Sequence, residues 1–383
     1  MSHLKRLLLV TSALVVSFNL QAGSLFDEPS GLWATDSDLG FSSDTIEWAS
    51  SSDSTATGPE PNPGFSYDPD PFGIALPFSL AQASDADAAA SGLSPEEQAE
   101  MAAIGEALAN PLSYLWLMFT QLDTIKYEGD VLDALGEDEI INHTLLVQPV
   151  LSLQLTQEWK AVIRPVIPIN SFETVDNVDL STGGVFDPVG VDLERETGIG
   201  DIVLWTAFSK QYKPPNIFGF GVTAMFDTAT DDALGTGKNS IGPMALAFSI
   251  TEKWILGVVA QHWESVGGSD HRTINTDAGP VRVDRPDVSL TDVQPVVRYR
   301  VNQLTNIGLA PNWRYNHETD QASIPIGLGF DTLVKWGKLP IKMGVEFYTY
   351  AESDDDFGGD SQIRFLFIPV LPSPEWSRDP IFN

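Results

Sequence analysis

The stretch that decides the fold is TDVQPVVRYRVNQLTNIGLAPNWRYN, residues 291–316, in which polar and apolar residues alternate on both sides of a short turn. In its second half, one set is polar or small (Asn306, Gly308, Ala310, Asn312, Arg314, Asn316) and the other is apolar (Ile307, Leu309, Pro311, Trp313, Tyr315). A period of two is typical of β-strands, whose successive side chains point to opposite faces. The stretch therefore predicts two antiparallel strands, 289–301 and 305–316, each with one polar and one apolar face.

The tight turn at residues 302–304 predicts the register of these two strands, because it places Val301 opposite Thr305. Counting outward pairs Arg300 with Asn306, Arg298 with Gly308, Gln294 with Asn312 and Asp292 with Arg314. A slip by one residue would move the arginines of one strand to the apolar face. We therefore expect an ion pair between Asp292 and Arg314.

The same alternation predicts ten further strands, at 112–127, 142–155, 159–169, 199–210, 216–227, 240–250, 254–266, 322–331, 339–351 and 361–371. Runs of about ten residues suit a tilted strand that crosses a bilayer, which needs ~9–11. Short turns alternate with long connections, at 128–141, 170–198, 228–239 and 267–288, and aromatic residues collect at strand ends. These features favour an all-β fold: a transmembrane antiparallel up-and-down β-barrel of about 12 strands, with its apolar face toward lipid.

The N-terminal third differs in composition from this region. Residues 1–22 resemble a secretory signal peptide, because Lys5 and Arg6 precede an apolar run that ends near small Ala22. Residues 23–93, rich in Ser, Asp, Pro and Gly, predict a disordered acidic segment. A short helix is expected over 94–110, with Ser94 as its N-cap. The barrel then spans 111–371, and 372–383 form a C-terminal tail. The helix could enter the barrel as a plug or lie outside it as a spacer.

The overall charge of the chain limits which kinds of partner it can bind. The chain has 53 acidic and 21 basic residues and no cysteine. Residues 23–110 hold 16 acids and no Lys or Arg. Such acidity excludes nucleic acid as a partner, because phosphate binding needs clustered cations. The absence of cysteine excludes disulfides and a lipoprotein anchor.

A Gly-Lys loop, FDTATDDALGTGKNSIGP (226–243), raises the possibility of nucleotide binding. The phosphate-loop pattern fails, however, because Asp232 and Asn239 occupy positions that require glycine and a hydroxyl. We interpret the motif (Thr230, Asp231, Asp232, Gly235, Gly237, Lys238) as a turn between two strands, and no nucleotide is expected. Its acids could form Asx turns. Acids in this and the other long loops could bind calcium or lipopolysaccharide-bound cations, although none has EF-hand spacing and solvated charge is the simpler interpretation.

The polar face supplies the candidate lumen-lining residues, which are Gln148, Arg164, Asp201, Asp292, Gln294, Arg298, Arg314, Lys342, Glu346 and Arg364. Their mixed charges fit a selectivity lining. They fit equally well a packed salt-bridge network that closes a narrow barrel. The sequence leaves both open.

Several of these segments resemble a known family. They are ANP (109–111), QPV (148–150), RPVIP (164–168), GIGD (198–201), TATDDALGTGKNSIGP (228–243), VQPVVRY (293–299) and IRFLFI (363–368). The combination resembles a bacterial outer-membrane family assigned to the MetA pathway of phenol degradation, whose members are often labelled transporter or neuromedin U. The resemblance covers about 105–370 and implies an outer-membrane barrel that takes up aromatic or other small hydrophobic compounds. Residues 23–93 and the tail depart from it.

Enzymatic candidates are few. His262 and Ser265 are three residues apart in a strand, so their side chains should lie on opposite faces. We therefore expect no catalytic residues, no metal and no cofactor. The sequence predicts a porin-like channel in the bacterial outer membrane for passive passage of small hydrophobic or aromatic molecules. Its expected partners are membrane lipid, lipopolysaccharide, the barrel assembly machinery and the solute. The alternatives are a structural or surface-interaction barrel with a closed lumen, or an outer-membrane phospholipase-like enzyme.

Overall fold

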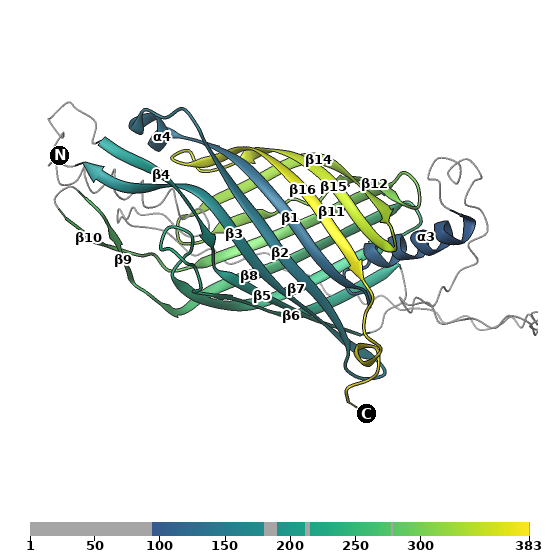
Figure 1. Cartoon of the computed structure of the whole chain (residues 1–383). Helices are drawn as coiled ribbons and strands as arrows, with labels where there is room; N and C mark the ends of the chain where they lie inside the picture. The colour runs from purple at the N-terminus through teal and green to yellow at the C-terminus, as the bar shows by residue number, and fades with distance from the viewer. Residues whose placement is uncertain (1–93, 180–189, 211–214, 277–278, 383) are drawn as a thin grey trace, which may run out of the picture. The chain divides into compact units, whose positions relative to one another are not determined.

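The computed structural model describes residues 94–179, 190–210, 215–276 and 279–382. The expected signal peptide and acidic segment therefore lie outside the described residues. The helices are α3 (Pro95–Ala109), α4 (Asp130–Leu135) and the 3-10 helix η1 (Glu375–Ser377). The strands, labelled in Figure 1, are β1 (Trp116–Glu128), β2 (Ile140–Gln154), β3 (Trp159–Asp179), β4 (Gly190–Ile199), β5 (Ile202–Lys210), β6 (Asn216–Phe226), β7 (Lys238–Ile250), β8 (Trp254–Gly268), β9 (His271–Ile274), β10 (Val281–Asp284), β11 (Ser289–Arg300), β12 (Thr305–Leu309), β13 (Trp313–Asn316), β14 (Gln321–Trp336), β15 (Leu339–Glu352) and β16 (Gly358–Leu371).

Fourteen of these strands form one antiparallel sheet that closes on itself. The first strand, β1, pairs with the last, β16, and β8 pairs with β11 across the separate β9–β10 hairpin. β4 and β5 are the two parts of one interrupted strand, and so are β12 and β13. The wall therefore has twelve positions, and the predicted antiparallel barrel of about 12 strands is confirmed.

The two faces of the wall differ as the alternation requires. On β16, Phe365 is 50% exposed, whereas its neighbours Arg364 and Leu366 are 4% and 6% exposed. The same exposed apolar set continues around the barrel and includes Leu122, Ile169, Phe218, Phe220, Leu256, Val297, Ile307, Leu328, Phe330, Met343 and Phe347. A continuous apolar belt of this kind is unfavourable in water but matches the hydrocarbon core of a bilayer. The fold is a transmembrane β-barrel.

The two ends of the barrel are built differently, as Figure 1 shows. One end, here named the helix end, carries α3, the C-terminal residues and the short turns at 155–158, 251–253, 301–304 and 337–338. The other, the loop end, carries α4, the β9–β10 hairpin and the connections at 227–237, 317–320 and 353–357. None of the helices in the described residues is long and apolar enough to cross a membrane.

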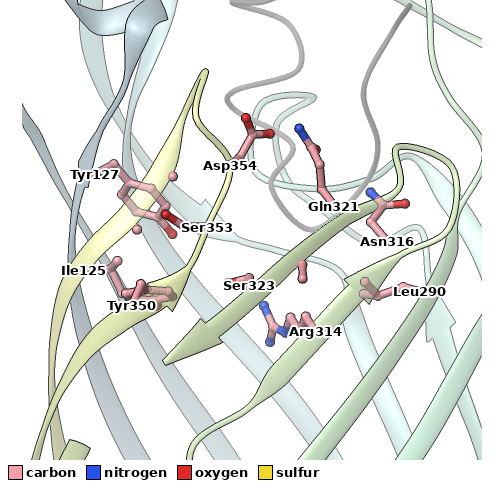
Figure 2. A pocket seen from close by; sticks show the side chains of 13 residues that line it. Ile125, Tyr127, Leu290, Arg314, Asn316, Gln321, Ser323, Tyr350, Ser353 and Asp354 are labelled. Carbon is pink, nitrogen blue, oxygen red and sulfur yellow. The ribbon is translucent and has the colours of Figure 1, made fainter. Parts of the chain in front are cut away.

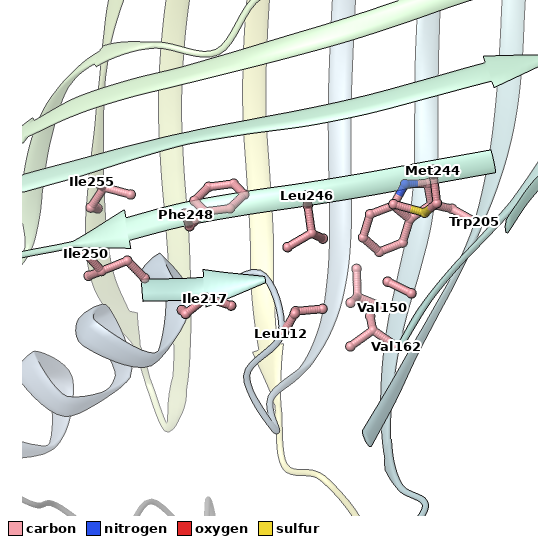
Figure 3. Close-up of a cluster of buried hydrophobic side chains, with 11 residues drawn as sticks. Leu112, Val150, Val162, Trp205, Ile217, Met244, Leu246, Phe248, Ile250 and Ile255 are labelled. Atoms are coloured by element: carbon pink, nitrogen blue, oxygen red, sulfur yellow. The ribbon is translucent and has the colours of Figure 1, made fainter. Parts of the chain in front are cut away.

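Helix α3 begins with a capping box, because the Ser94 hydroxyl accepts from the Glu97 amide and the Glu97 carboxylate accepts from the Ser94 amide. Met101 and Ile104 are fully buried against Leu115, Leu333 and Val370. The helix thus packs at the helix end of the barrel against Leu333 and Val370, which lie on the inward face of the wall. The chain that follows also enters the barrel, because fully buried Leu112 lies among side chains of the barrel interior (Figure 3). Neither expected arrangement, plug or spacer, describes this docking fully.

The structure corrects several strand boundaries. The predicted strand 305–316 is interrupted at 310–312, so Gln294 does not pair with Asn312. The physical reason is Pro311, which has no N–H to donate to the ladder. The predicted strand 199–210 breaks at 200–201, and the predicted strand 112–127 begins only at Trp116.

Three of the expected long loops also contain secondary structure. The 128–141 connection contains helix α4, and the 267–288 connection contains the β9–β10 hairpin. The prediction of a loop at 170–198 is wrong, because β3 and β4 extend through its described parts. Residues 180–189 within it lie outside the described residues.

The barrel interior as the candidate functional site

A cluster of six charged side chains occupies one side of the interior, and we name it the ion cluster. Its members are Asp123, Arg298, Asp331, Lys342, Glu346 and Arg364, from β1, β11, β14, β15 and β16. Arg364 Nε lies 2.8 Å from Asp123 Oδ1, and Lys342 Nζ lies 3.0 Å from Asp331 Oδ1. Arg298 donates to both Asp331 and Glu346. Three cations thus face three anions, and this part of the interior is neutral.

The strand break at 310–312 is attached to this cluster. The Ala310 carbonyl accepts from Arg364 at 2.9 Å and from Gln294 Nε2 at 3.1 Å. The Ala310 amide donates to the Tyr348 hydroxyl at 3.3 Å, and that hydroxyl donates to Glu346 at 2.6 Å. Interior side chains therefore satisfy backbone groups that the wall leaves unpaired. The ladder to β14 ends at Gly308 and resumes at Arg314.

The predicted register and ion pair are both confirmed beside the break. Asp292 pairs with Arg314 across the ladder, and Arg314 Nε lies 3.1 Å from Asp292 Oδ2. Asp292 also accepts from Asn312 Nδ2 at 3.1 Å. Arg314 is half-exposed and lines a cavity of about 80 Å³ near the loop end, which Figure 2 shows between Tyr350, Ser323 and Asp354.

The opposite side of the interior is apolar, and we name it the apolar wall. Its buried members are Leu112, Val150, Val162, Trp205, Ala207, Ile217, Met244, Leu246, Phe248, Ile250 and Ile255. Figure 3 shows side chains of this wall from β2, β3, β5, β6, β7 and β8, with Leu112, from the segment before β1, among them. Two of the predicted lining residues lie at its edge: Arg164 on β3 and Gln148 on β2, with Arg164 Nε donating to Gln148 Oε1 at 2.8 Å. The interior is therefore divided into a neutral ionic side and an apolar side.

Asp201, another predicted lining residue, holds the loop at 227–237. One carboxylate oxygen accepts from the amides of Thr228 and Ala229 at 3.2 Å, and the other accepts from the Thr236 hydroxyl at 2.7 Å. Gly235 packs so closely that a Cβ there would lie 2.7 Å from Asp201 Oδ1. The break at 200–201 thus serves to anchor this loop.

The Gly-Lys motif is itself a packed turn. Thr230 donates from its amide to the Ile199 carbonyl at 2.8 Å, and Asp231 accepts from the Ala233 amide at 2.8 Å as an Asx turn. Asp232 lies 3.4 Å from Arg285. Gly237 has φ +64°, and Lys238 is buried with its Nζ 2.8 Å from Asp270 and 2.9 Å from Asp287. The Lys238 ammonium therefore joins two neighbouring loops.

The residues weighed for an enzyme are not arranged as a nucleophile and its base. His262 bonds Thr291 and Glu264, each at 2.9 Å, whereas the Ser265 hydroxyl accepts from the Val288 amide at 3.3 Å. His271 lies 2.9 Å from Asp284, and His143 lies 3.0 Å from Thr124. Within the described ranges, no group of three or more His, Asp or Glu could hold a metal ion.

Sequence reasoning missed four important interior residues: Phe119, Asp123, Trp205 and Asp331. Asp123 lies two residues from Gln121 on the same face of β1, and Asp331 lies two residues from Gly329 on the same face of β14, so strand parity could have found both. Phe119 and Trp205 carry no such signal, because aromatic residues also populate the outward face.

Comparison with known proteins gives structural resemblances alone. No family model matches the chain, and no curated protein matches it. An outer membrane channel from Pseudomonas putida F1 is 15% identical with TM-score 0.46, and the match covers 67% of this chain and 95% of that one. The Ralstonia pickettii toluene transporter TbuX is 9% identical with TM-score 0.36, covering 70% and 93%. Outer membrane phospholipase A from Escherichia coli is 12% identical with TM-score 0.34, covering 70% and 98%.

These three neighbours are named as a channel, a transporter and an enzyme, so the likeness assigns no function to this chain. The resemblance to the phenol-degradation family stays a prediction.

Proposed function

We propose that the chain is an outer-membrane channel for passive passage of small hydrophobic or aromatic molecules. The observation that carries this proposal is the apolar wall. A porin for hydrophilic solutes needs a polar, water-filled lumen. Here eleven buried apolar side chains line one side of the interior, and the charges on the other side neutralise one another. Such an interior favours a small solute with an apolar surface over an ion or a sugar.

The route is narrow. The cavity at the loop end measures about 80 Å³, which is smaller than the ~150 Å³ engineered cavity that accepts benzene. Leu112 lies against the apolar wall at the helix end. Passage therefore requires side chains to move, and we expect low conductance and selective passage. The solute would enter at the loop end, beside Arg314, and leave past Leu112.

Localisation follows from the same proposal. The exposed apolar belt would contact membrane lipid. Aromatic side chains at its helix end, Trp159, Trp254 and Tyr299, and at its loop end, Trp313 and Tyr315, would lie at the two interfaces. The longer connections would then face outward and contact lipopolysaccharide, while the helix end faces the periplasm. The barrel assembly machinery would insert the chain.

Uptake by vesicles with a lipopolysaccharide outer leaflet tests the proposal, because that leaflet resists hydrophobic solutes. Vesicles that carry the protein should take up a labelled neutral aromatic faster than empty vesicles and should exclude arabinose. Leu246→Asn, in the apolar wall, should slow this uptake. Leu366→Asn, an equally buried leucine on the ionic side, should slow it less. Equal uptake with and without the protein would refute the channel.

One observation favours a second candidate, a structural barrel with a closed lumen. The ion cluster is buried and tied to the wall, and α3 covers part of the helix end with Lys335 3.2 Å from both Glu97 and Glu100. This candidate expects neither uptake nor single-channel conductance from purified protein. The channel proposal expects small but measurable conductance, so one bilayer recording separates the two.

A further inference from the structure

Arg164 differs from the cations of the ion cluster and from Arg314. Arg298, Lys342 and Arg364 pair with carboxylates of the ion cluster, and Arg314 pairs with Asp292. No ion pair to Arg164 is formed by any carboxylate in the part of the chain that the structure describes. Its guanidinium instead donates twice to Gln148 Oε1.

This pairing is unexpected in so acidic a chain. With 53 acidic residues against 21 basic ones, there is no shortage of carboxylates to neutralise an interior arginine. A guanidinium away from bulk water is unfavourable without an anion. The arginine is only half-buried, so part of it still faces the interior space. Arg164 thus carries a positive charge whose natural counterpart would be a bound anion.

Hydrogen-bond donors beside Arg164 also lack acceptors. An arginine can only donate, so its bonds fix Gln148 Oε1 as the acceptor and leave Gln148 Nε2 as the free end of the amide. That Nε2 is buried and has no hydrogen-bond partner among the described residues, and Gln148 is 2% exposed. Thr223 Oγ1 is also buried without a hydrogen-bond partner among the described residues, and Thr223 is 0% exposed.

The register of the strands brings these groups together. Arg164 pairs with Trp205, and Trp205 pairs with Thr223, so the three lie in one row across β3, β5 and β6. Adjacent strands are ~4.8 Å apart, which separates the ends of this row by ~10 Å. An extended arginine side chain and a small ligand can span that distance. The row therefore places hydrogen-bond donors, Arg164 and Thr223, on either side of Trp205.

Apolar groups complete the site. The Arg164 guanidinium lies 4.8 Å from the centre of the Phe119 ring and 6.0 Å from that of Trp205. Val150, Trp205 and Met244 belong to the apolar wall beside it. The flexible methionine side chain can yield to a ligand. These contacts suit an apolar or aromatic body next to the anionic group, and Figure 3 shows Val150, Trp205 and Met244 close to one another.

We propose that Arg164 and Gln148 form a binding station for the carboxylate of a small amphipathic monocarboxylate, whose apolar body lies against Trp205. The guanidinium fork matches the planar carboxylate, and the single charge of Arg164, without a carboxylate partner among the described residues, suits a monoanion. The inference rests on the proposed channel and names a solute class for it. Lys160, four residues along the same strand and also without a carboxylate partner in the described residues, lies 4.7 Å from the Tyr114 ring and would continue the path toward the helix end.

The test uses benzoate as the probe and its neutral isostere benzamide as the comparison. Calorimetry on the purified full chain in detergent should show benzoate binding that Arg164→Gln weakens by ~10- to 100-fold, as expected for a hydrogen bond to a charged group. Arg282→Gln, an exposed arginine of the β9–β10 hairpin, should bind benzoate as well as the wild type does. Benzamide should bind weakly and equally to all three proteins.

Equal benzoate affinity in the wild type and Arg164→Gln, or absence of benzoate binding to the wild type, would overturn the proposal. If Arg164→Gln does not fold, Arg164→Lys keeps the charge without the fork and should bind benzoate several-fold more weakly than the wild type; unchanged affinity would count against the site. Vesicle uptake separates the two proposals. Uptake of neutral aromatics without Arg164-dependent benzoate binding rejects only the station, whereas such binding without any uptake rejects only the channel.

Discussion

Replacing Glu346 by Gln should destabilise the barrel more than any surface substitution of the same kind. Glu346 is 1% exposed and accepts from Arg298 and from the Tyr348 hydroxyl, with Arg364 Nη1 at 3.6 Å. The amide keeps the shape but removes the charge that two buried guanidinium groups share. Breaking a buried ion pair on one side costs about 3–5 kcal/mol, because the remaining charge stays buried.

A loss of about 4 kcal/mol lowers the folding equilibrium constant by roughly three orders of magnitude. The measurement is equilibrium unfolding of refolded protein in lipid or detergent, followed by circular dichroism. Glu352→Gln is the matched control, because Glu352 is exposed near the end of the same strand. It should change the free energy of unfolding by less than ~0.5 kcal/mol.

A double variant separates charge balance from packing. Arg298→Met with Glu346→Leu removes one cation and one anion, leaving Lys342 with Asp331 and Arg364 with Asp123. Neutral, well-packed replacements of a buried pair are often tolerated. We expect the double variant to be more stable than Glu346→Gln alone. A Glu346→Gln protein within ~1 kcal/mol of the wild type, or a double variant less stable than Glu346→Gln, would refute this account of the ion cluster.

Three further predictions concern the two ends. Gly237→Ala should destabilise the loop by ~1–3 kcal/mol and speed its proteolysis, because φ at this residue is +64° and an added Cβ would lie 1.3 Å from Arg285 Nη1. Gly267→Ala is the control and should do neither, because an added Cβ there would have no atom within 4 Å. The Ser94 amide and hydroxyl, with Lys335, lower the pKa of Glu97 from 4.5. Because the pKa of Glu97 is lowered in the folded chain, its ionised carboxylate stabilises docked α3 above pH 4.5, and this contribution is lost as the pH falls through the lowered pKa. Hydrogen exchange in α3 should therefore rise in acid, and Glu97→Gln should abolish the pH dependence. In the cysteine-free chain, Asp138→Cys should react with an impermeant thiol reagent on whole cells and Lys338→Cys should not; the opposite labelling would invert the proposed orientation.

Interior chemistry was only partly accessible to sequence reasoning. The Asp292–Arg314 pair could be predicted because a three-residue turn fixes which residues of two neighbouring strands meet. The Arg364–Asp123 pair could not, since it joins strands at opposite ends of the barrel sequence and exists only because β1 closes on β16. The same limit applies to Arg164, whose lack of a carboxylate partner depends on every strand around it.

By itself, the sequence determined the properties that are local along the chain. Alternation decided which side chains of each strand face outward, and turn lengths decided that neighbours pair antiparallel, because both depend on a few consecutive residues. The tertiary structure alone decided how the interior is divided. Closure of twelve wall positions gathered six charges into one neutral cluster and eleven apolar side chains into the opposite wall. It also placed Leu112 inside the barrel and stopped the ladder at Pro311. These features depend on contacts across the closed barrel, which no window of sequence contains.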